Sequence, residues 1–203
     1  FLDIDFGTYP FVTSSNTISG NATVGSGVGP SNSFYTLGIT KAYTTRVGNG
    51  PFPTEEKGQL GELLAKKGKE FGTVTGRKRR CGWFDTVLLK QAIKISGISG
   101  LALTKLDILD DFDQIKLCIG YKIDNKEIDY FPSDEHEQKK IKPIYKTLSG
   151  WVANTFGLTQ YEKLPNKAKL FLEEIEKLVD CKIDIISTGP ARDHTIILKK
   201  LLN

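Results

Sequence analysis

The class of fold is decided by the stretch Asp85-Thr-Val-Leu-Leu-Lys-Gln-Ala-Ile-Lys-Ile-Ser-Gly-Ile-Ser-Gly-Leu-Ala-Leu103. Asp85 is a predicted N-cap for a helix from Thr86 to about Ile95, because an aspartate side chain accepts hydrogen bonds from the first free backbone N–H groups of a helix. The apolar run Ile98–Leu103 that follows predicts a buried strand. A helix that leads at once into a buried strand is typical of an α/β protein.

Helical and strand-like segments alternate along the rest of the chain as well. Near the start, the alternation of Leu2, Ile4 and Phe6 with Asp3 and Asp5 predicts another strand. The other expected elements are an apolar element over 35–43, a loop over 46–54, a helix over 60–69, strands over 115–123 and 182–186, a charged and exposed segment over 124–143, an amphipathic helix over 168–179 with Ala168, Leu172, Ile175 and Val179 on one face, and a closing element over 195–202.

The charge balance argues against a polyanionic partner. The 203 residues include 28 basic and 24 acidic side chains, a formal net charge of +4, and the run Arg77–Arg80 alone equals this excess. No nucleic-acid partner is therefore expected.

The cysteines Cys81, Cys118 and Cys181 form no C-x-x-C pair and indicate a reducing compartment. No apolar stretch is long enough to span a membrane, so we expect a cytoplasmic protein.

A glycine- and threonine-rich turn leads into four consecutive cations in the segment Gly72–Asp85, which reads Gly-Thr-Val-Thr-Gly-Arg-Lys-Arg-Arg-Cys-Gly-Trp-Phe-Asp. Gly72 and Gly76 let backbone N–H groups approach a ligand, and the hydroxyls of Thr73 and Thr75 add neutral donors. Such converging donors suit a carboxylate or phosphate. The alternative interpretation is a solvated basic run or a nucleic-acid patch.

Two predicted strands end in residues that could recognise a guanine base, and ligands of α/β sheets bind beyond such strand ends. Asp107, after the first strand, could accept two N–H bonds from guanine that adenine does not offer, a difference of roughly 1–3 kcal/mol. The stem of Lys105 could lie along the base while its ammonium stays in solvent. Backbone N–H groups in Ser187–Pro190, after the second strand, could bind the base carbonyl. Alternatively, Asp107 is a helix cap and Ser187–Pro190 an ordinary turn.

These segments together resemble one known family. The chain contains, in order and at family-like spacing, Thr13-Ser-Ser-Asn16, Arg46-Val-Gly-Asn-Gly-Pro-Phe-Pro-Thr-Glu55, Gly72–Asp85, Leu103-Thr-Lys-Leu-Asp107 and Ile186-Ser-Thr-Gly189. Over essentially its whole length it closely resembles the C-terminal half of adenylosuccinate synthetase. The resemblance implies a P-loop-NTPase-like α/β fold, namely the C-terminal part of a large mixed β-sheet with flanking helices. It also implies a single domain, with substrate loops over 1–85 and a guanine-recognition region over 98–203.

The resemblance further implies a GTP-dependent ligase that joins L-aspartate to IMP in the route to AMP. In that family a phosphoryl group passes from GTP to O6 of IMP, and the aspartate amine then displaces phosphate at C6. GTP is thus the implied co-substrate, Mg²⁺ the implied cofactor, and a homodimer the implied assembly.

The binding residues carry over by resemblance in three sets. The IMP set is Thr13, expected at a helix N-terminus that binds the 5′-phosphate, Val47, expected at the ribose through its backbone, and Arg77. The aspartate set is Thr73, Val74, Thr75, Gly76, Arg77 and Arg79. The GTP set is Arg79, Lys105, Leu106, Asp107, Ser187, Thr188 and Gly189. Two positions depart from the family pattern: Lys78 stands where arginine is common, and Val74 stands where a hydroxylated residue is common.

The resemblance places the phosphate loop, the catalytic Asp and His, and most Mg²⁺ contacts upstream of this sequence. Neither His136 nor His194 matches the catalytic position, so no catalytic or metal-binding residue is assigned here. The chain begins with a strand-like pattern and contains no Met, and we therefore expect a fragment, inactive alone, whose partner is the missing N-terminal half. Two alternatives are a weak guanine-nucleotide-binding module and a nucleic-acid-binding protein, and the absence of aromatic residues interleaved with Arg77–Arg80 argues against the latter.

Overall fold

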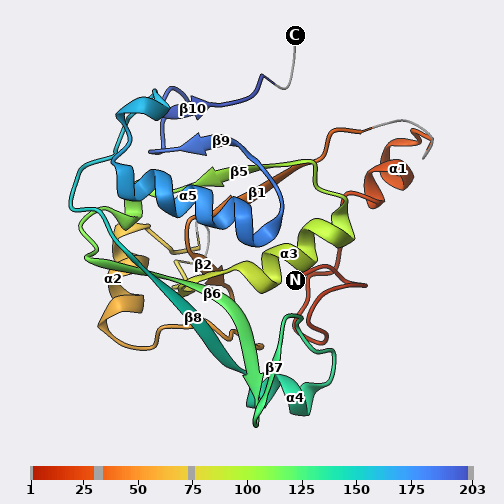
Figure 1. The fold of residues 1–203 in the computed structure, drawn as a ribbon. Coiled ribbons are helices and arrows are strands. Elements are labelled where there is room, and N and C mark those ends of the chain that lie inside the picture. Colours follow the sequence, from red (N-terminus) through yellow and green to blue (C-terminus); the bar gives the residue numbers. More distant parts are fainter. Residues whose placement is uncertain (1, 30–33, 73–75, 201–203) are drawn as a thin grey trace.

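A sheet of four strands organises the fold. The computed structural model describes residues 2–29, 34–72 and 76–200. The strand order in this sheet is β1 (Leu37–Lys41), β5 (Gly100–Thr104), β9 (Ile183–Ser187) and β10 (Thr195–Ile197). The first three strands are parallel and β10 is antiparallel to β9. The carboxyl ends of β1, β5 and β9 therefore meet at one end of the sheet (Figure 1).

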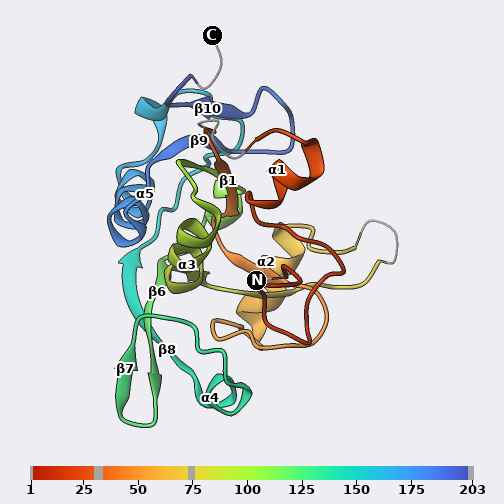
Figure 2. The ribbon, with the colours of Figure 1, turned by 90° about the vertical axis from the view of Figure 1, so that its right-hand side faces the viewer.

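Helices lie on both sides of this sheet. Figure 2 shows α3 (Thr86–Ser96) and α5 (Asn166–Val179) side by side on one side, with α1 (Asn21–Ser26) and α2 (Gln59–Lys67) on the other. The helix α5 buries the predicted stripe, which consists of Ala168, Leu172, Ile175 and Val179. With Leu101 and Leu103 of β5, this stripe forms part of the main core. The α/β class predicted from the sequence is confirmed.

The other strands of the described residues form two smaller sheets. In the first, β2 (Thr44–Arg46) pairs with β3 (Arg80–Gly82). In the second, the long strand β6 (Gln114–Ile123) pairs with β4 (Phe84–Asp85), β7 (Lys126–Ile128) and β8 (Lys142–Ser149). Figure 1 shows β6 and β8 running away from the main sheet toward α4 (Glu135–Lys140). Two short 3₁₀ helices complete the elements, η1 (Leu106–Leu109) and η2 (Tyr161–Lys163).

The predicted strand at the start of the chain is wrong. Asp3 is buried there, whereas Leu2, Ile4 and Phe6 are exposed. The carboxylate of Asp3 accepts the backbone N–H groups of two residues just after it, Asp5 and Phe6, and of two across the loop, Thr17 and Ile18. A buried acid therefore organises this segment as a loop, which the alternating apolar pattern did not reveal.

The segment 124–143 is only partly exposed, contrary to the prediction. It contains β7 and α4, and Ile128 and Phe131 are buried against Tyr121 in a small second core. The strand β8, which follows it, was not predicted. Its backbone pairs along its length with β6, and none of its residues is fully buried.

Candidate functional site

The two predicted base-recognition segments lie next to each other. They follow β5 and β9, which are neighbouring parallel strands with Leu103 paired to Ile186. Asp107 lies half-buried in η1. Burial raises the pKa of its carboxyl, and nearby Lys105 and His194 act in the opposite direction. The pKa of Asp107 thus responds to charges on its own segment and on the segment after β9.

Hydrogen bonds within the Ser187–Gly189 segment and to neighbouring residues hold this segment in place. The hydroxyl of Ser187 donates to the carbonyl of Gly189 at 3.0 Å. Thr188 is fully buried, and its hydroxyl donates to the carbonyl of Leu158 at 2.8 Å. Its N–H donates to the carbonyl of His194 at 3.0 Å. The buried side chain of Thr188 therefore stabilises the segment. Ser187 and Gly189 are better placed than Thr188 to contact a ligand.

His194 contacts this segment although no pattern in the sequence pointed to it. Its ring meets that of Phe156 edge to face at 4.9 Å between centroids. Its Nδ1 is buried and has no hydrogen-bond partner among the residues that the structure describes. A Cβ atom on Gly189 would collide with this nitrogen. Glycine at 189 is thus required by the close approach of the His194 ring.

Lys105 adopts a different geometry from the one predicted. It has a left-handed backbone with φ of 61° at the start of η1. Its ammonium is bound to the protein: Nζ donates to Oε1 of Glu70 at 2.7 Å and to the carbonyl of Gly68 at 2.6 Å. A buried carboxylate that was not predicted therefore sets the direction of this side chain.

Glu70 gathers donors from three parts of the chain. Its side chain has 0% exposure, and besides Lys105 its carboxylate accepts Nζ of Lys41 at 2.9 Å, the hydroxyl of Tyr43 at 2.6 Å and a guanidinium nitrogen of Arg79 at 2.8 Å. Burial acts to raise the pKa of Glu70, but hydrogen bonds from Lys105, Tyr43, Lys41 and Arg79 outweigh it and lower the pKa to about 2. The carboxylate is therefore ionised throughout the ordinary pH range. The only feature of the sequence that hinted at this role of Glu70 was its position just before the Gly72–Asp85 segment.

The predicted anion-binding loop is closed at its base. Thr73, Val74 and Thr75 lie outside the described residues. On either side of them, the N–H of Gly72 donates to the carbonyl of Arg77 and the N–H of Gly76 donates to the carbonyl of Gly72, both at 2.8 Å. Gly76 has φ of 63°, which favours glycine. This closure leaves Arg77 exposed at the place where the chain turns back.

The last cation of the run has a structural role. Arg80 makes two hydrogen bonds to the carboxylate of Glu55, at 2.8 and 2.6 Å. It also donates to the carbonyls of Gly48 and Gly50, at 3.2 and 2.9 Å. Arg80 therefore holds the loop that contains Val47 against the basic segment.

A cleft of about 420 Å³ brings together two predicted site residues, Val47 and Arg79. Lys41 and Arg46 add two further cations to its wall. Burial, followed by the nearby charge of Arg80, lowers the pKa of Arg46. Cations beside an exposed valine suit a ligand that combines an anionic group with a sugar or ring.

Thr13 is not at a helix N-terminus, so that expectation is wrong. Its N–H donates to the carbonyl of Leu2 at 2.7 Å, and the next helix, α1, begins only at Asn21. The N–H groups of Thr17 and Ile18 that a helix would have left free are taken by Asp3. The carboxylate of Asp3 thus takes the N–H groups that the helix N-terminus implied by the resemblance would have offered to a ligand.

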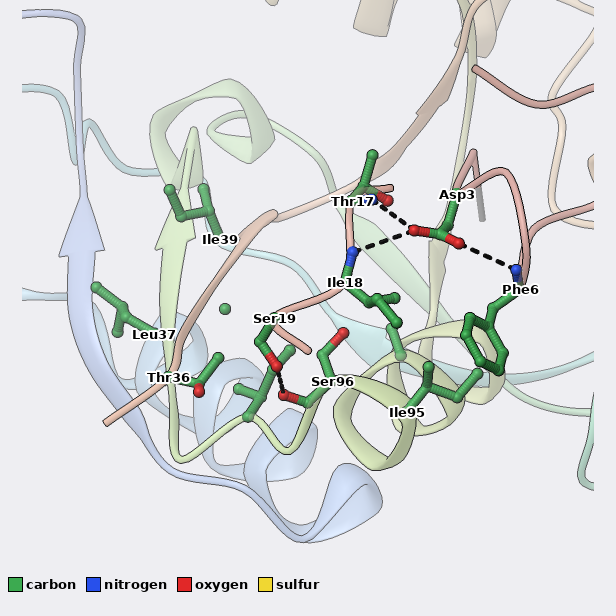
Figure 3. Close-up of a pocket in the computed structure, with 13 residues that line it drawn as sticks. Asp3, Phe6, Thr17, Ile18, Ser19, Thr36, Leu37, Ile39, Ile95 and Ser96 are labelled. Carbon is green, nitrogen blue, oxygen red and sulfur yellow. Dashed lines mark hydrogen bonds between the residues drawn. The ribbon is translucent and has the colours of Figure 1, made fainter. Parts of the chain in front are cut away.

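A second cavity, of about 440 Å³, lies between the N-terminal loop, β1 and α3 (Figure 3). Leu37, Ile39 and Ile95 line it, and Figure 3 shows Asp3 beside it, bonded to the loop. None of the predicted site residues lines this cavity.

In residues 2–29, 34–72 and 76–200, no group of three His, Cys, Asp or Glu side chains could hold a metal ion. No helix in the same ranges is long and apolar enough to cross a membrane.

Comparisons with known proteins point to one family. A family model described as adenylosuccinate synthetase matches residues 1–196. The adenylosuccinate synthetase of Ehrlichia chaffeensis is 57% identical over 198 residues, which cover 98% of this chain and 46% of that protein. The structure of a fully ligated adenylosuccinate synthetase from Plasmodium falciparum matches with a TM-score of 0.94 at 39% identity, over 98% of this chain and 48% of that one. A cyanophage S-2L succinoaminodeoxyadenylate synthetase shares the fold, with a TM-score of 0.55 at 15% identity over 98% of this chain and 44% of that one. The chain thus spans about half the length of the relatives it matches.

Proposed function

The chain belongs to the adenylosuccinate synthetase family, and from that premise we propose that it is the C-terminal, ligand-binding half of a GTP-dependent ligase that joins L-aspartate to IMP. In this proposal Asp107 and the Ser187–Gly189 segment select the guanine base of GTP. Arg77 and Arg79 bind the carboxylates of aspartate and border the two nucleotides.

The observation that carries the proposal is the shared carboxylate of Glu70. It joins Arg79 of the anion-binding loop to Lys105 of the base-recognition segment, at 2.8 and 2.7 Å. A reaction that moves a phosphoryl group from GTP to IMP and then admits aspartate needs all three ligands close together. The shared carboxylate supports such a common site.

Each proposed contact uses a group that the chain presents. The carboxylate of Asp107 accepts the N1 proton and the exocyclic amine of guanine. The guanidinium of Arg79 has one nitrogen on Glu70, so its other edge can form a charge-assisted pair with a carboxylate or phosphate. Val47 contacts the ribose of IMP from the cleft, Arg77 reaches IMP from the loop, and Thr13 approaches the 5′-phosphate from a loop.

The groups that activate IMP belong, in this proposal, to the N-terminal half. We assign no Mg²⁺ ligand to this chain, because the family resemblance places most Mg²⁺ contacts in the N-terminal half. Mg²⁺, when bound elsewhere in the enzyme, supplies charge neutralisation for the transferred phosphoryl group. The homodimer is likewise proposed from the family.

A product assay tests the proposal. The gene product that carries these 203 residues is incubated with IMP, L-aspartate, GTP and Mg²⁺, and we expect adenylosuccinate, GDP and phosphate in equal amounts. The 203-residue polypeptide assayed alone is expected to yield none. Product from the polypeptide alone would contradict the assignment of the activating groups to the other half. Guanine-nucleotide binding by the gene product without any product would instead favour the binding-module alternative.

A further inference from the structure

Glu70 stands where three segments of the chain meet. It follows α2 by way of Lys69, whose backbone is left-handed with φ of 50°. Its N–H donates to the carbonyl of Ala65 at 2.8 Å, and its carbonyl accepts the N–H of Arg79 at 2.9 Å. The backbone is therefore held on both sides, by α2 and by the returning arm of the anion-binding loop, and the side chain is directed inward.

The two oxygens of Glu70 divide the donors between them. Oε1 accepts Lys41, Tyr43 and Lys105, and Oε2 accepts Lys41 and Arg79. A carboxylate has about four lone-pair sites, and five contacts fill them. Glu70 therefore has no capacity left for a ligand, and any effect it has on one must pass through the cations.

The cluster keeps an excess of positive charge. One carboxylate faces three cations, a formal net charge of +2. The side chains of Lys41, Arg79 and Lys105 are 27%, 30% and 32% exposed. Each thus has one part on Glu70 and another open to solvent, where an anionic ligand can balance the excess. Without the carboxylate the three cations would repel one another.

We propose that Glu70 is a positioning residue that holds Arg79 and Lys105 in one arrangement, so that the anion site and the base site form together. The identities of the two ligands, aspartate and a guanine nucleotide, rest on the proposed function. Glu70 touches neither ligand and acts only through the two cations.

The variant Glu70→Gln in the gene product tests this, because it keeps the shape of the side chain and removes its charge. Calorimetry measures Kd for GDP, and steady-state kinetics measure KM for aspartate. We expect both constants to rise about tenfold or more, because small displacements of binding groups are costly. The matched control is Glu55→Gln, which removes the carboxylate bound to the neighbouring Arg80 and should change each constant less than about threefold.

Three outcomes overturn the proposal: a rise in only one constant, equal rises in the two variants, or a lower melting temperature and kcat with both constants unmoved. The last result is that of a purely structural residue.

A readout without catalysis separates this proposal from the proposed function. Side-chain NMR of the ligand-free gene product, with signals assigned through Arg79→Lys and Lys105→Arg, reports the hydrogen bonds of the two cations. Glu70→Gln should shift both signals, and Glu55→Gln neither. If the unaltered gene product binds no GDP and forms no adenylosuccinate, the proposed function fails. The NMR result then still decides whether Glu70 holds both cations, and an unchanged signal from either one refutes it.

Discussion

The hydroxyl of Tyr121 donates a hydrogen bond of 2.7 Å to Oδ2 of Asp85, while Oδ1 of the same carboxylate accepts the N–H groups of Val87 and Leu88 at the start of α3. One buried side chain thus caps a helix and joins that helix to β6. Burial raises the pKa of Asp85 to about 6, against the opposing effect of these hydrogen bonds. The folded protein therefore binds a proton more tightly at this site than the unfolded chain does.

This shift predicts a pH dependence of stability. Because the pKa of Asp85 is about 6 when folded and 3.8 as a free side chain, its contribution is most favourable below about pH 4 and declines as pH rises to 6. Asp85→Asn keeps an N-cap acceptor but cannot ionise. Between pH 4 and pH 7 the variant should gain up to about 3 kcal/mol of unfolding free energy relative to the parent. Urea denaturation at several pH values measures this.

The control for this prediction is Asp134→Asn, at the exposed cap of α4. Backbone hydrogen bonds from Glu137 and His136 lower the pKa of Asp134, so its contribution changes with pH in the opposite direction. Parallel stability curves for the parent and Asp85→Asn would refute the prediction.

Asp107→Asn should reduce the preference for guanine nucleotides. An amide cannot accept both N–H groups of guanine, so the variant should lose roughly 1–3 kcal/mol of discrimination between the two nucleotides. The ratio of kcat/KM for GTP to kcat/KM for ATP should therefore fall about 5- to 150-fold. The comparison variant is Asp111→Asn, whose carboxylate is exposed and lies 3.2 Å from the ammonium of Lys67. Unchanged selectivity in Asp107→Asn would mean that Asp107 only shapes η1.

Arg79→Lys should weaken aspartate binding although the charge is kept. Lysine can still pair with Glu70, but it lacks the planar fork that binds a second carboxylate. We expect KM for aspartate to rise about 10- to 100-fold, as for the loss of a charge-assisted hydrogen bond. Lys78→Ala is the control, because this exposed ammonium lies 3.7 Å from an exposed carboxylate of Glu62. Similar increases in both variants would show that only the total charge of the loop matters.

Gly189→Ala should weaken guanine-nucleotide binding through His194. The added Cβ meets the His194 ring, and such overpacking costs about 1–3 kcal/mol, which calorimetry with GDP would detect. Removing the ring in Gly189→Ala/His194→Ala should restore most of the affinity. At Gly25 an added Cβ meets nothing within 4 Å, so Gly25→Ala is the control. Additive effects of the two substitutions would contradict the proposed collision.

The elements predicted correctly have causes that are local in the sequence. Asp85 precedes the helix that it caps, and the buried stripe of α5 follows the helical period. The adjacency of the two base-recognition segments could also be expected, because both follow buried parallel strands. Their ligand contacts remain predictions.

The features that were missed depend on residues far apart in the chain. Residues 2–6 alternate like a strand, but Asp3 is buried by backbone groups of residues 17 and 18. Lys105 was expected in solvent, but its ammonium lies on Glu70.

Local patterns alone thus specified the α/β class, the Asp85 helix cap and the motifs of the family, because short-range backbone hydrogen bonds and apolar periodicity depend on neighbouring residues. Folding alone placed the cations of residues 41, 79 and 105 around the single carboxylate of Glu70. A buried charge requires partners, and which cations supply them is settled only when the ends of β1 and β5 come together with the loop after α2.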